Sequence, residues 1–432
     1  MSISNRQRFL DICHFKRPGD LYAHDYFWPE TLRKWVKQGA PEQILNERFR
    51  ADYFQLDFVP WIGDIRSGLW WAGKITDLGY GIKAGEGTPP TIPAFEPRIV
   101  SEDERTITVR NSSGQTVRYL RDAPSRMPMF LDWPVRDRAT WKEYKKRLDP
   151  NTPERWPADW NTWVQKMKDK REATSSSEES YMPNQESSDW NSWVQERKSK
   201  SEPIMFKGIT FASHPVSLQV GSFYGYLREM IGSERILYMF YDDPVLIEDM
   251  MDAMLHLETE VIKRVVKDIR IDQATFWEDM AYKTGPLISP AMVRKFMMPR
   301  YKKITELLRR NGVDVIFVDS DGNVNELIPL WLESGINYVW PLEVAAHNDA
   351  VALRKKYGKD LIMSGNIDKR ALIKGKEAIR EEVMSKVPFL LEQGGYFPTI
   401  DHWVPPDVTF ENYCYYINTL REAAGLEKLS FY

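Results

Sequence analysis

The stretch Phe317-Val318-Asp319-Ser320-Asp321 joins the end of a short apolar run to two carboxylates and a hydroxyl group. Three further stretches also run from apolar to polar residues: Phe276-Trp277-Glu278-Asp279, Met363-Ser364-Gly365-Asn366-Ile367-Asp368 and Pro398-Thr399-Ile400-Asp401-His402. When parallel strands pack in a barrel, their C-terminal ends meet at one opening, where such enzymes carry out their chemistry. The pattern therefore predicts an α/β enzyme with its site at the strand ends.

Strand and helix signals alternate around these stretches. Capping side chains predict where several helices begin, at Asp243-Pro244, Ser289-Pro290, Asn348 and Asp368. Units of roughly 25 to 40 residues of this kind are typical of parallel βαβ structure. Five units are clear, and we expect the remaining strands at Asp20–Trp28, at Phe54–Ile62 and at Met205–Phe211. The sequence predicts one domain over residues 1–432, an α/β fold of the (β/α)8 TIM barrel type.

Two segments interrupt the alternation. Residues 95–120 alternate apolar and polar side chains around Asn111-Ser112-Ser113-Gly114, which predicts an inserted β-hairpin. Within residues 151–202, the heptapeptide at 159–165 recurs almost unchanged at 189–195, with a polar, serine-rich linker between the copies. Two copies are too few to stack into a repeat architecture. We expect a duplicated surface insertion, which is either a tolerated loop or an arm that docks a partner.

The composition excludes several classes of protein. The chain of 432 residues has a net charge of -3 with both signs mixed along it, so no basic stripe is available for nucleic acid. Its two cysteines, Cys13 and Cys414, offer neither a disulfide framework nor a thiolate metal cluster. No stretch approaches the about 18 apolar residues of a membrane span. We expect a cytoplasmic protein that binds a small molecule rather than nucleic acid or a membrane.

The polar strand ends provide candidate catalytic groups. Asp319 and Asp321 are two residues apart, so they share one face if the strand continues through both. Together with His402 they form a credible ligand set for a divalent ion. They equally suit acid–base catalysis, because neighbouring carboxylates shift each other's pKa. A structural role stays open, in which the two aspartates brace the Gly322 turn and His402 packs under Trp403.

The chain resembles the uroporphyrinogen decarboxylase (URO-D) superfamily, which contains decarboxylases and zinc-dependent corrinoid and coenzyme M methyltransferases. The resemblance covers about residues 5–425 apart from the two insertions, and it implies a distorted (β/α)8 barrel. It is carried by Arg17-Pro18, Leu287-Ile288-Ser289-Pro290, Asp321-Gly322-Asn323, Gly365-Asn366-Ile367-Asp368 and Asp401-His402-Trp403-Val404-Pro405-Pro406 with Glu411-Asn412.

The two branches of the superfamily differ at informative positions. In the methyltransferase branch, a His-x-Cys pair and a later Cys hold zinc where this chain has Asp319, Asp321 and His402. The resemblance thus implies a divalent ion, zinc or another transition metal, on those three residues, with Glu278 as a fourth ligand or base. Glu278 could also serve as the acid toward the leaving oxygen. In the decarboxylase branch an arginine-containing segment grips the substrate's carboxylates, whereas residues 24–28 contain no arginine.

We therefore expect a metal-dependent methyltransferase that demethylates a methoxylated aromatic compound and passes the methyl group to a corrinoid protein. The ion would act as a Lewis acid, and Glu278, Asp321 and His402 would be catalytic. Substrate contacts are expected from His24, Tyr26, Trp28, Trp277, Trp340 and Asn366, although core packing also explains the aromatic ones. Uroporphyrinogen-type decarboxylation, another lyase or hydrolase activity and a non-catalytic binding role remain alternatives, and a homodimer is left open.

Overall fold

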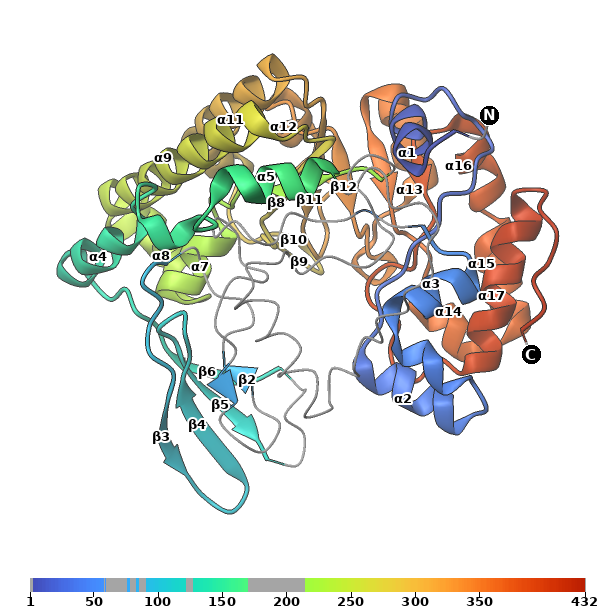
Figure 1. Cartoon of the computed structure of the whole chain (residues 1–432), viewed down its shortest axis with the longest axis horizontal. Helices are drawn as coiled ribbons and strands as arrows, with labels where there is room; N and C mark the ends of the chain where they lie inside the picture. Colours follow the sequence, from blue (N-terminus) through green and yellow to red (C-terminus); the bar gives the residue numbers. More distant parts are fainter. Residues whose placement is uncertain are drawn as a thin grey trace.

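A parallel sheet forms the centre of the molecule (Figure 1). The computed structural model describes residues 3–57, 59, 76–77, 83–84, 91–121, 127–169 and 214–431. The strands of the sheet, in spatial order, are β14 (Tyr396–Phe397), β13 (Ile362–Ser364), β12 (Tyr338–Trp340), β11 (Val315–Asp319), β8 (Gln273–Trp277) and β7 (Ser217–Gln219). All neighbouring strands are parallel, so their C-terminal ends lie at one edge. Within the described residues the sheet does not close into a barrel, and β7 and β14 are its two outer strands.

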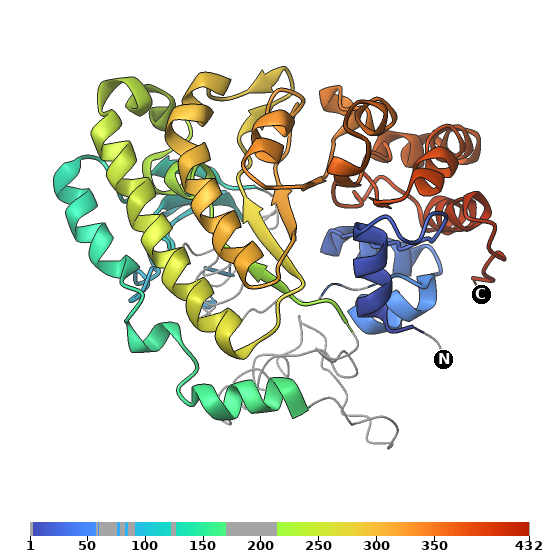
Figure 2. The same cartoon turned by 90° about the horizontal axis from the view of Figure 1, so that it is seen from above.

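Helices cover the outer face of the sheet, where alternate strand residues such as Phe276, Val318 and Met363 enter the main apolar core. Figure 2 shows α9 and α11 running side by side across this face. The helices between β7 and β12 are α7 (Gly225–Ile231), α8 (Arg235–Asp242), α9 (Pro244–Asp268), α10 (Pro290–Met292), α11 (Met298–Arg310) and α12 (Ile328–Glu333). The helices after β12 are α13 (Ala350–Tyr357), α14 (Lys369–Lys374), α15 (Lys376–Met384), α16 (Val387–Gln393) and α17 (Phe410–Ala423).

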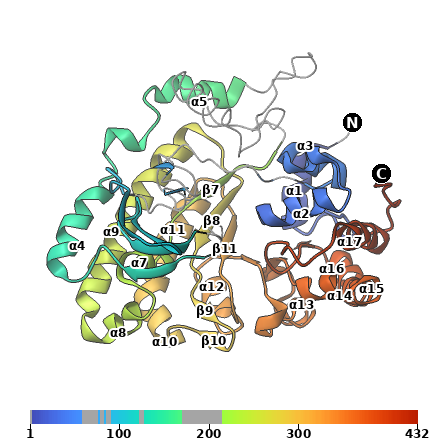
Figure 3. The same cartoon turned by 90° about the horizontal axis from the view of Figure 1, so that it is seen from below.

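The inner face of the sheet packs against the N-terminal helix α1 (Asn5–Cys13). A second apolar cluster joins Phe9, Ile12 and Cys13 of α1, together with Tyr22, to residues of four strands: Val315, Tyr338, Ile362 and Phe397. Figure 3 shows α1, α2 (Pro29–Lys37) and α3 (Glu47–Phe54) beside the C-terminal helices. Helix α1 therefore forms one apolar cluster with strands from the last third of the chain.

Asp25 links these first and last parts of the chain. Its carboxylate accepts hydrogen bonds from the Ile400 amide at 2.9 Å and from the Tyr413 hydroxyl at 2.8 Å. Burial raises the pKa of Asp25 from 3.8 to about 7, although both hydrogen bonds act in the opposite direction. The folded state therefore holds the Asp25 proton more tightly than the unfolded chain does.

We expect this carboxyl group to make stability depend on pH. Its contribution is fully present below pH 3.8 and is lost as the pH rises to about 7. At about 1.4 kcal/mol per pKa unit, the loss is on the order of 4 kcal/mol. Asp25→Asn should flatten the decline of unfolding free energy over this range in urea titrations. Asp407→Asn, at an exposed position, serves as the control, and equal slopes in the Asp25 variant and the wild type would refute the assignment.

A separate antiparallel sheet precedes the parallel one in sequence. It consists of β3 (Arg98–Glu102), β4 (Thr106–Arg110), β5 (Thr116–Leu120) and β6 (Met129–Asp132), in that order. The β4 and β5 strands pair around the Asn111–Gly114 turn, within the segment for which a hairpin is predicted. Two short strands, β1 (Thr76–Asp77) and β2 (Lys83–Ala84), pair with each other, as do β9 (Ala281–Tyr282) and β10 (Gly285–Pro286).

The first copy of the duplicated heptapeptide starts a helix, α5 (Trp160–Asp169), which follows α4 (Arg138–Lys145). The Trp160 indole N–H donates to Asp268 at 2.6 Å, and the guanidinium of Arg264 lies 4.8 Å from the Trp160 ring. Both partners belong to α9, so this copy is anchored on the outer helix layer. The second copy and the serine-rich linker lie outside the described residues.

Several predicted elements differ in the structure. The segment Asp20–Trp28 is not a strand, since its only β-type pairing in the described chain is the parallel bridge between Phe27 and Val404. Phe54 ends helix α3, so the strand predicted from it onward is wrong at its start, and its later part is outside the described residues except residue 59. The predicted strand Met205–Phe211 also lies outside them.

The helix caps are mostly as predicted. Asp243, Ser289 and Asp368 each accept a hydrogen bond from the first turn of the helix that follows. The cap of α13 is Asp349 rather than Asn348. Of the helices described, none combines the length and the hydrophobicity that a membrane span requires.

Candidate active site

The side chains of Trp277, Asp319 and Trp340 are neighbours at the C-terminal edge of the parallel sheet. In the strand register Asp319 of β11 is paired with Trp277 of β8 on one side and with Trp340 of β12 on the other. Paired residues of parallel strands project to the same face. The carboxyl group of Asp319 thus emerges between two indole rings on the inner face.

Asp321 and His402 meet at this edge. The His402 Nε2 lies 3.4 Å from the Asp321 carboxylate, and the imidazole stacks on Trp340 with ring centroids 6.0 Å apart. Burial lowers the pKa of His402, but the hydrogen bond and charge of Asp321 outweigh it, so that the pKa is raised overall. An imidazole held in this way is suited to donate a proton near neutral pH.

An aromatic wall continues from His402. Tyr26 lies 5.7 Å from Trp340 and 6.1 Å from Trp403, and Trp28 lies 4.7 Å from Trp403, all between ring centroids. His24 packs edge-on against Tyr26 at 5.8 Å. The structure thus brings together four of the predicted substrate contacts: His24, Tyr26, Trp28 and Trp340.

Two buried polar atoms of this wall have no hydrogen-bond partner in the described structure, the Nδ1 of His24 and the Nε1 of Trp340. Burial lowers the pKa of His24 to about 4, so its imidazole is neutral at physiological pH. Leaving a buried polar atom unpaired costs free energy. Both atoms are therefore buried without the hydrogen bond that would offset the cost.

The predicted metal centre does not form as drawn. In the described residues, no group of three or more His, Cys, Asp and Glu side chains is arranged to hold a metal ion. The reason is local: β11 ends at Asp319, so Asp321 lies beyond the strand and the two carboxylates need not share a face. Of these two carboxylates, the one that forms an ion pair with His402 is Asp321. Burial and the charges of Asp321 and Asp279 raise the pKa of Asp319 well above its ordinary value.

The Glu278 side chain, for which a ligand or acid role is predicted, takes part in hydrogen bonds with the turn before α7. Its fully buried carboxylate accepts hydrogen bonds from the Ser222 hydroxyl and from the backbone amides of Phe223 and Tyr224, at 2.8 to 2.9 Å. Burial raises the pKa of Glu278, and these hydrogen bonds oppose that effect. Glu278 holds the turn that leads into α7.

Trp277 and Asn366 also have structural partners. The guanidinium of Arg228 lies 5.0 Å from the Trp277 ring, which therefore packs against α7. The Asn366 side chain is buried; it donates to the carbonyl groups of Leu342 and Asn348 and accepts from the Ala350 amide. Both amide hydrogens of Asn366 are used in bracing these loops, so the structure gives it no free donor for substrate.

Two charged residues that are not among the predicted site residues lie near His402. Lys369 Nζ lies 3.2 Å from the Glu343 carboxylate and 3.6 Å from that of Asp401. Glu343 raises the pKa of His402, whereas Lys369 lowers it. A signal was available, because Glu343 closely follows the strand β12 and Lys369 opens α14 after the Asp368 cap.

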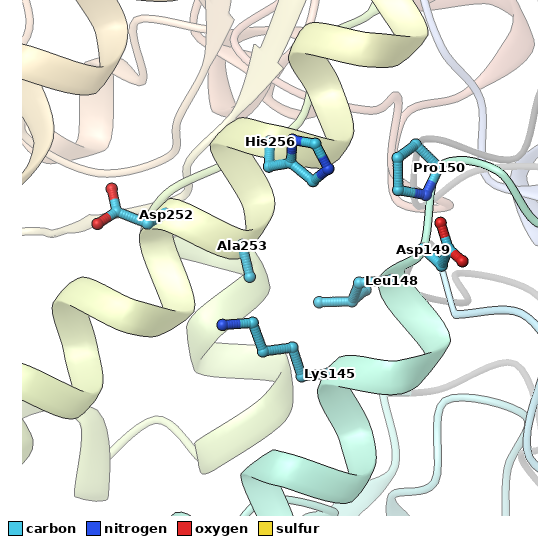
Figure 4. Close-up of a pocket in the computed structure, with 7 residues that line it drawn as sticks. All are labelled: Lys145, Leu148, Asp149, Pro150, Asp252, Ala253 and His256. Atoms are coloured by element: carbon cyan, nitrogen blue, oxygen red, sulfur yellow. The ribbon is translucent and has the colours of Figure 1, made fainter.

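A shallow pocket of about 400 Å³ lies away from this edge, between α4 and α9 on the outer helix layer (Figure 4). It is lined by Lys145, Leu148, Asp149, Pro150, Asp252, Ala253 and His256. It contains no strand-end residue, and Lys145 is already paired with Asp249 at 2.6 Å. The strand ends, with their aromatic wall and paired acid and imidazole, are the better candidate site.

Part of the chain matches a known protein family. Residues 213–423, which carry all six strands and His402, match the family model for uroporphyrinogen decarboxylase (URO-D). This part of the chain is therefore similar to the URO-D family. The candidate site lies at the strand ends of that part, with Tyr26 and Trp28 added by the N-terminal segment.

Curated relatives of the chain are distant. The uroporphyrinogen decarboxylase of Legionella pneumophila (strain Paris) is 24% identical over 193 residues, which cover 44% of this chain and 51% of the relative. That of Carboxydothermus hydrogenoformans is 26% identical over 140 residues, which cover 32% and 38% respectively. The chain thus matches about half of the length of these relatives, or less.

A solved structure extends the comparison to the whole chain. A methyltransferase from Methanosarcina mazei superposes with a TM-score of 0.55 over 98% of this chain and 99% of the other, at 12% sequence identity. Identity this low shows a shared fold alone. Together with the URO-D match, it supports a TIM-barrel-like α/β fold.

Proposed function

We propose that this protein is a methyltransferase of the URO-D superfamily that removes the methyl group of a small methoxylated aromatic compound. A corrinoid protein is the proposed methyl acceptor. The observation that carries the proposal is the position of His402, which is paired with Asp321 and stacked on Trp340 beside an aromatic wall. Such a wall suits a flat, largely apolar substrate.

The reaction needs a proton at one atom. When the methyl carbon is attacked, its bond to oxygen breaks and the electron pair stays on the leaving oxygen, which must be protonated. A bound corrinoid would supply the nucleophile that takes the methyl group. His402 supplies the proton to the leaving oxygen, and the carboxylate of Asp321 stabilises the imidazolium beforehand.

The rest of the site positions the substrate. The rings of Trp340 and Tyr26 flank the aromatic part of the substrate and limit the access of water. We propose that His24, whose Nδ1 has no hydrogen-bond partner in the described structure, contacts a polar ring substituent. Because the described residues do not assemble the three-ligand centre, no step of this mechanism uses a metal ion.

Decarboxylation is the second candidate, because the curated relatives that match are uroporphyrinogen decarboxylases. A substrate with many carboxylates would require several cationic partners. Arg228, which lies on the Trp277 ring, already pairs with Asp279 at 2.6 Å. Lys369 is paired with Glu343. This arrangement favours a less charged substrate.

One experiment separates the two candidates. The protein is incubated with a panel of methoxybenzoates and methoxyphenols, with and without reduced cobalamin as the methyl acceptor. We expect the demethylated phenol and methylcobalamin in equal amounts, and only when the acceptor is present. Release of carbon dioxide from uroporphyrinogen without any acceptor would favour decarboxylation, and an absence of phenol across the panel would refute the methoxyaromatic assignment.

A further inference from the structure

Two arginine side chains lie directly opposite each other in the antiparallel sheet. Arg98 of β3 is paired with Arg110 of β4, and Arg110 is paired in turn with Thr116 of β5. Residues that are directly opposite in antiparallel strands project to the same face, where like charges repel each other. The sheet therefore places two positive charges on neighbouring strands of one face, at the end where β4 turns into β5.

A third arginine, Arg147, joins these two from the segment directly after α4. The guanidinium carbons of Arg147 and Arg110 lie 4.2 and 4.9 Å from the centroid of the Phe95 ring. Partial burial lowers the pKa of Arg110, and the positive charges of Arg98 and Arg147 lower it further. The three guanidinium groups are therefore close enough to disfavour one another.

The protein's own carboxylates do not balance this charge. Asp132 raises the pKa of Arg110, but its carboxylate already accepts a hydrogen bond from Arg136 at 3.2 Å. Arg136 itself adds a further positive charge that lowers the pKa of Arg110. In the part of the chain that the structure describes, no carboxylate forms an ion pair with Arg98, Arg110 or Arg147. An anion from solution would relieve the repulsion among them.

A hollow of about 380 Å³ is lined by Phe95 and Arg147. Its walls also include Tyr144, whose buried hydroxyl has no hydrogen-bond partner in the described structure. Glu143 lines the hollow as well, but its carboxylate is paired with Lys146 at 2.6 Å. Cavities of about 300 to 1,000 Å³ are typical of sites for small molecules. The excess positive charge is therefore next to a hollow that fits a small ligand.

We propose that Arg98, Arg110 and Arg147 bind a small phosphate-bearing molecule, whose organic part lies in the hollow against Phe95. Guanidinium groups match the oxygens of a phosphate with paired hydrogen bonds, and a phosphate dianion balances more of the excess charge than a carboxylate does. Because the hollow has the size of a small-molecule site, the proposed ligand is a free molecule rather than a lipid headgroup. The site contains no residue of the parallel sheet, so it does not depend on the proposed methyl transfer.

Calorimetric titration with inorganic phosphate and with pyrophosphate tests the site. The titrations use the full chain in a chloride buffer of low ionic strength, since salt screens exposed charges. We expect saturable binding, tighter for pyrophosphate than for phosphate because of its greater charge, and no binding of acetate. Arg110→Gln removes the central charge and should weaken pyrophosphate binding at least about tenfold. Arg98→Gln, at an exposed position, should weaken it as well.

Arg105→Gln is the matched control. It removes the same charge from an exposed residue between β3 and β4 and should leave the affinity unchanged. Circular dichroism verifies that every variant is folded. A wild-type chain that does not bind pyrophosphate overturns the proposal, and so does an affinity that is the same in Arg110→Gln and Arg98→Gln as in the wild type. Cosedimentation with vesicles that contain phosphatidic acid, without binding of free pyrophosphate, would assign the arginines to a lipid surface instead.

Discussion

Replacing His402 with alanine is expected to reduce the rate of demethylation by about a hundredfold or more, since general acid catalysis contributes a factor of roughly 10² to 10⁴. The imidazole is the one proton donor that the described site holds beside a carboxylate and against the aromatic wall. His402 is partly exposed, so the variant should fold normally. The rate is measured as phenol formed under saturating methyl acceptor.

The matched variant Asp321→Asn separates catalysis from packing. It keeps the size of the side chain but removes the charge that raises the pKa of His402. Because a general acid must be protonated, activity falls once the pH exceeds that pKa, and this fall should move to lower pH in the variant. A His402→Ala variant with full activity, or an unchanged pH profile in Asp321→Asn, would contradict the proposed role.

The largest loss of stability is expected at Gly365. Its φ of 96° is unfavourable for residues with a side chain, and an added Cβ would lie 1.8 Å from the carbonyl oxygen of Pro341. Neither backbone can move easily, because Asn366 next to Gly365 is hydrogen-bonded to the Leu342 and Asn348 carbonyls. Gly365→Ala should therefore lower the free energy of unfolding by on the order of 3 to 5 kcal/mol.

Gly375 provides the control for this prediction. Its φ is 115°, yet an added Cβ there meets no atom within 4 Å. Gly375→Ala thus adds the conformational strain without the overlap, and it should cost only about 1 kcal/mol. Urea denaturation of the two variants measures the difference. Equal losses of stability would show that contact with the Pro341 carbonyl is not what requires glycine at position 365.

Much of the fold was predicted from local signals such as helix caps, because these depend only on residues that are close in the sequence. The caps Asp243, Ser289 and Asp368 precede their helices as the sequence indicates. The predicted strand at Asp20–Trp28 was wrong because a strand requires a partner. Its apolar residues are buried individually, and the bridge at Phe27 joins it to a residue in the last tenth of the chain.

Only part of the candidate site could be predicted, because side-chain direction and distant contacts are not visible in the local sequence. Position at a strand end located Asp321 and His402, and the structure brings them together. The prediction of Asp319 and Asp321 as joint metal ligands assumed that both side chains point to one face of a strand. The strand β11 ends at Asp319, so this assumption does not hold for Asp321. The partners of Glu278 come from a segment more than fifty positions earlier, and no local pattern reveals such contacts.

The packing of α1 has a consequence for how the chain folds during synthesis. The helix is made before the strands, but its docking surface includes Phe397 of the last strand of the sheet. Translation proceeds at about 5 to 20 residues per second, so tens of seconds pass before that surface leaves the ribosome. The apolar side of α1, with Phe9 and Ile12, must stay undocked throughout this interval. Nascent chains of this protein should therefore depend on holding chaperones until β14 has been made.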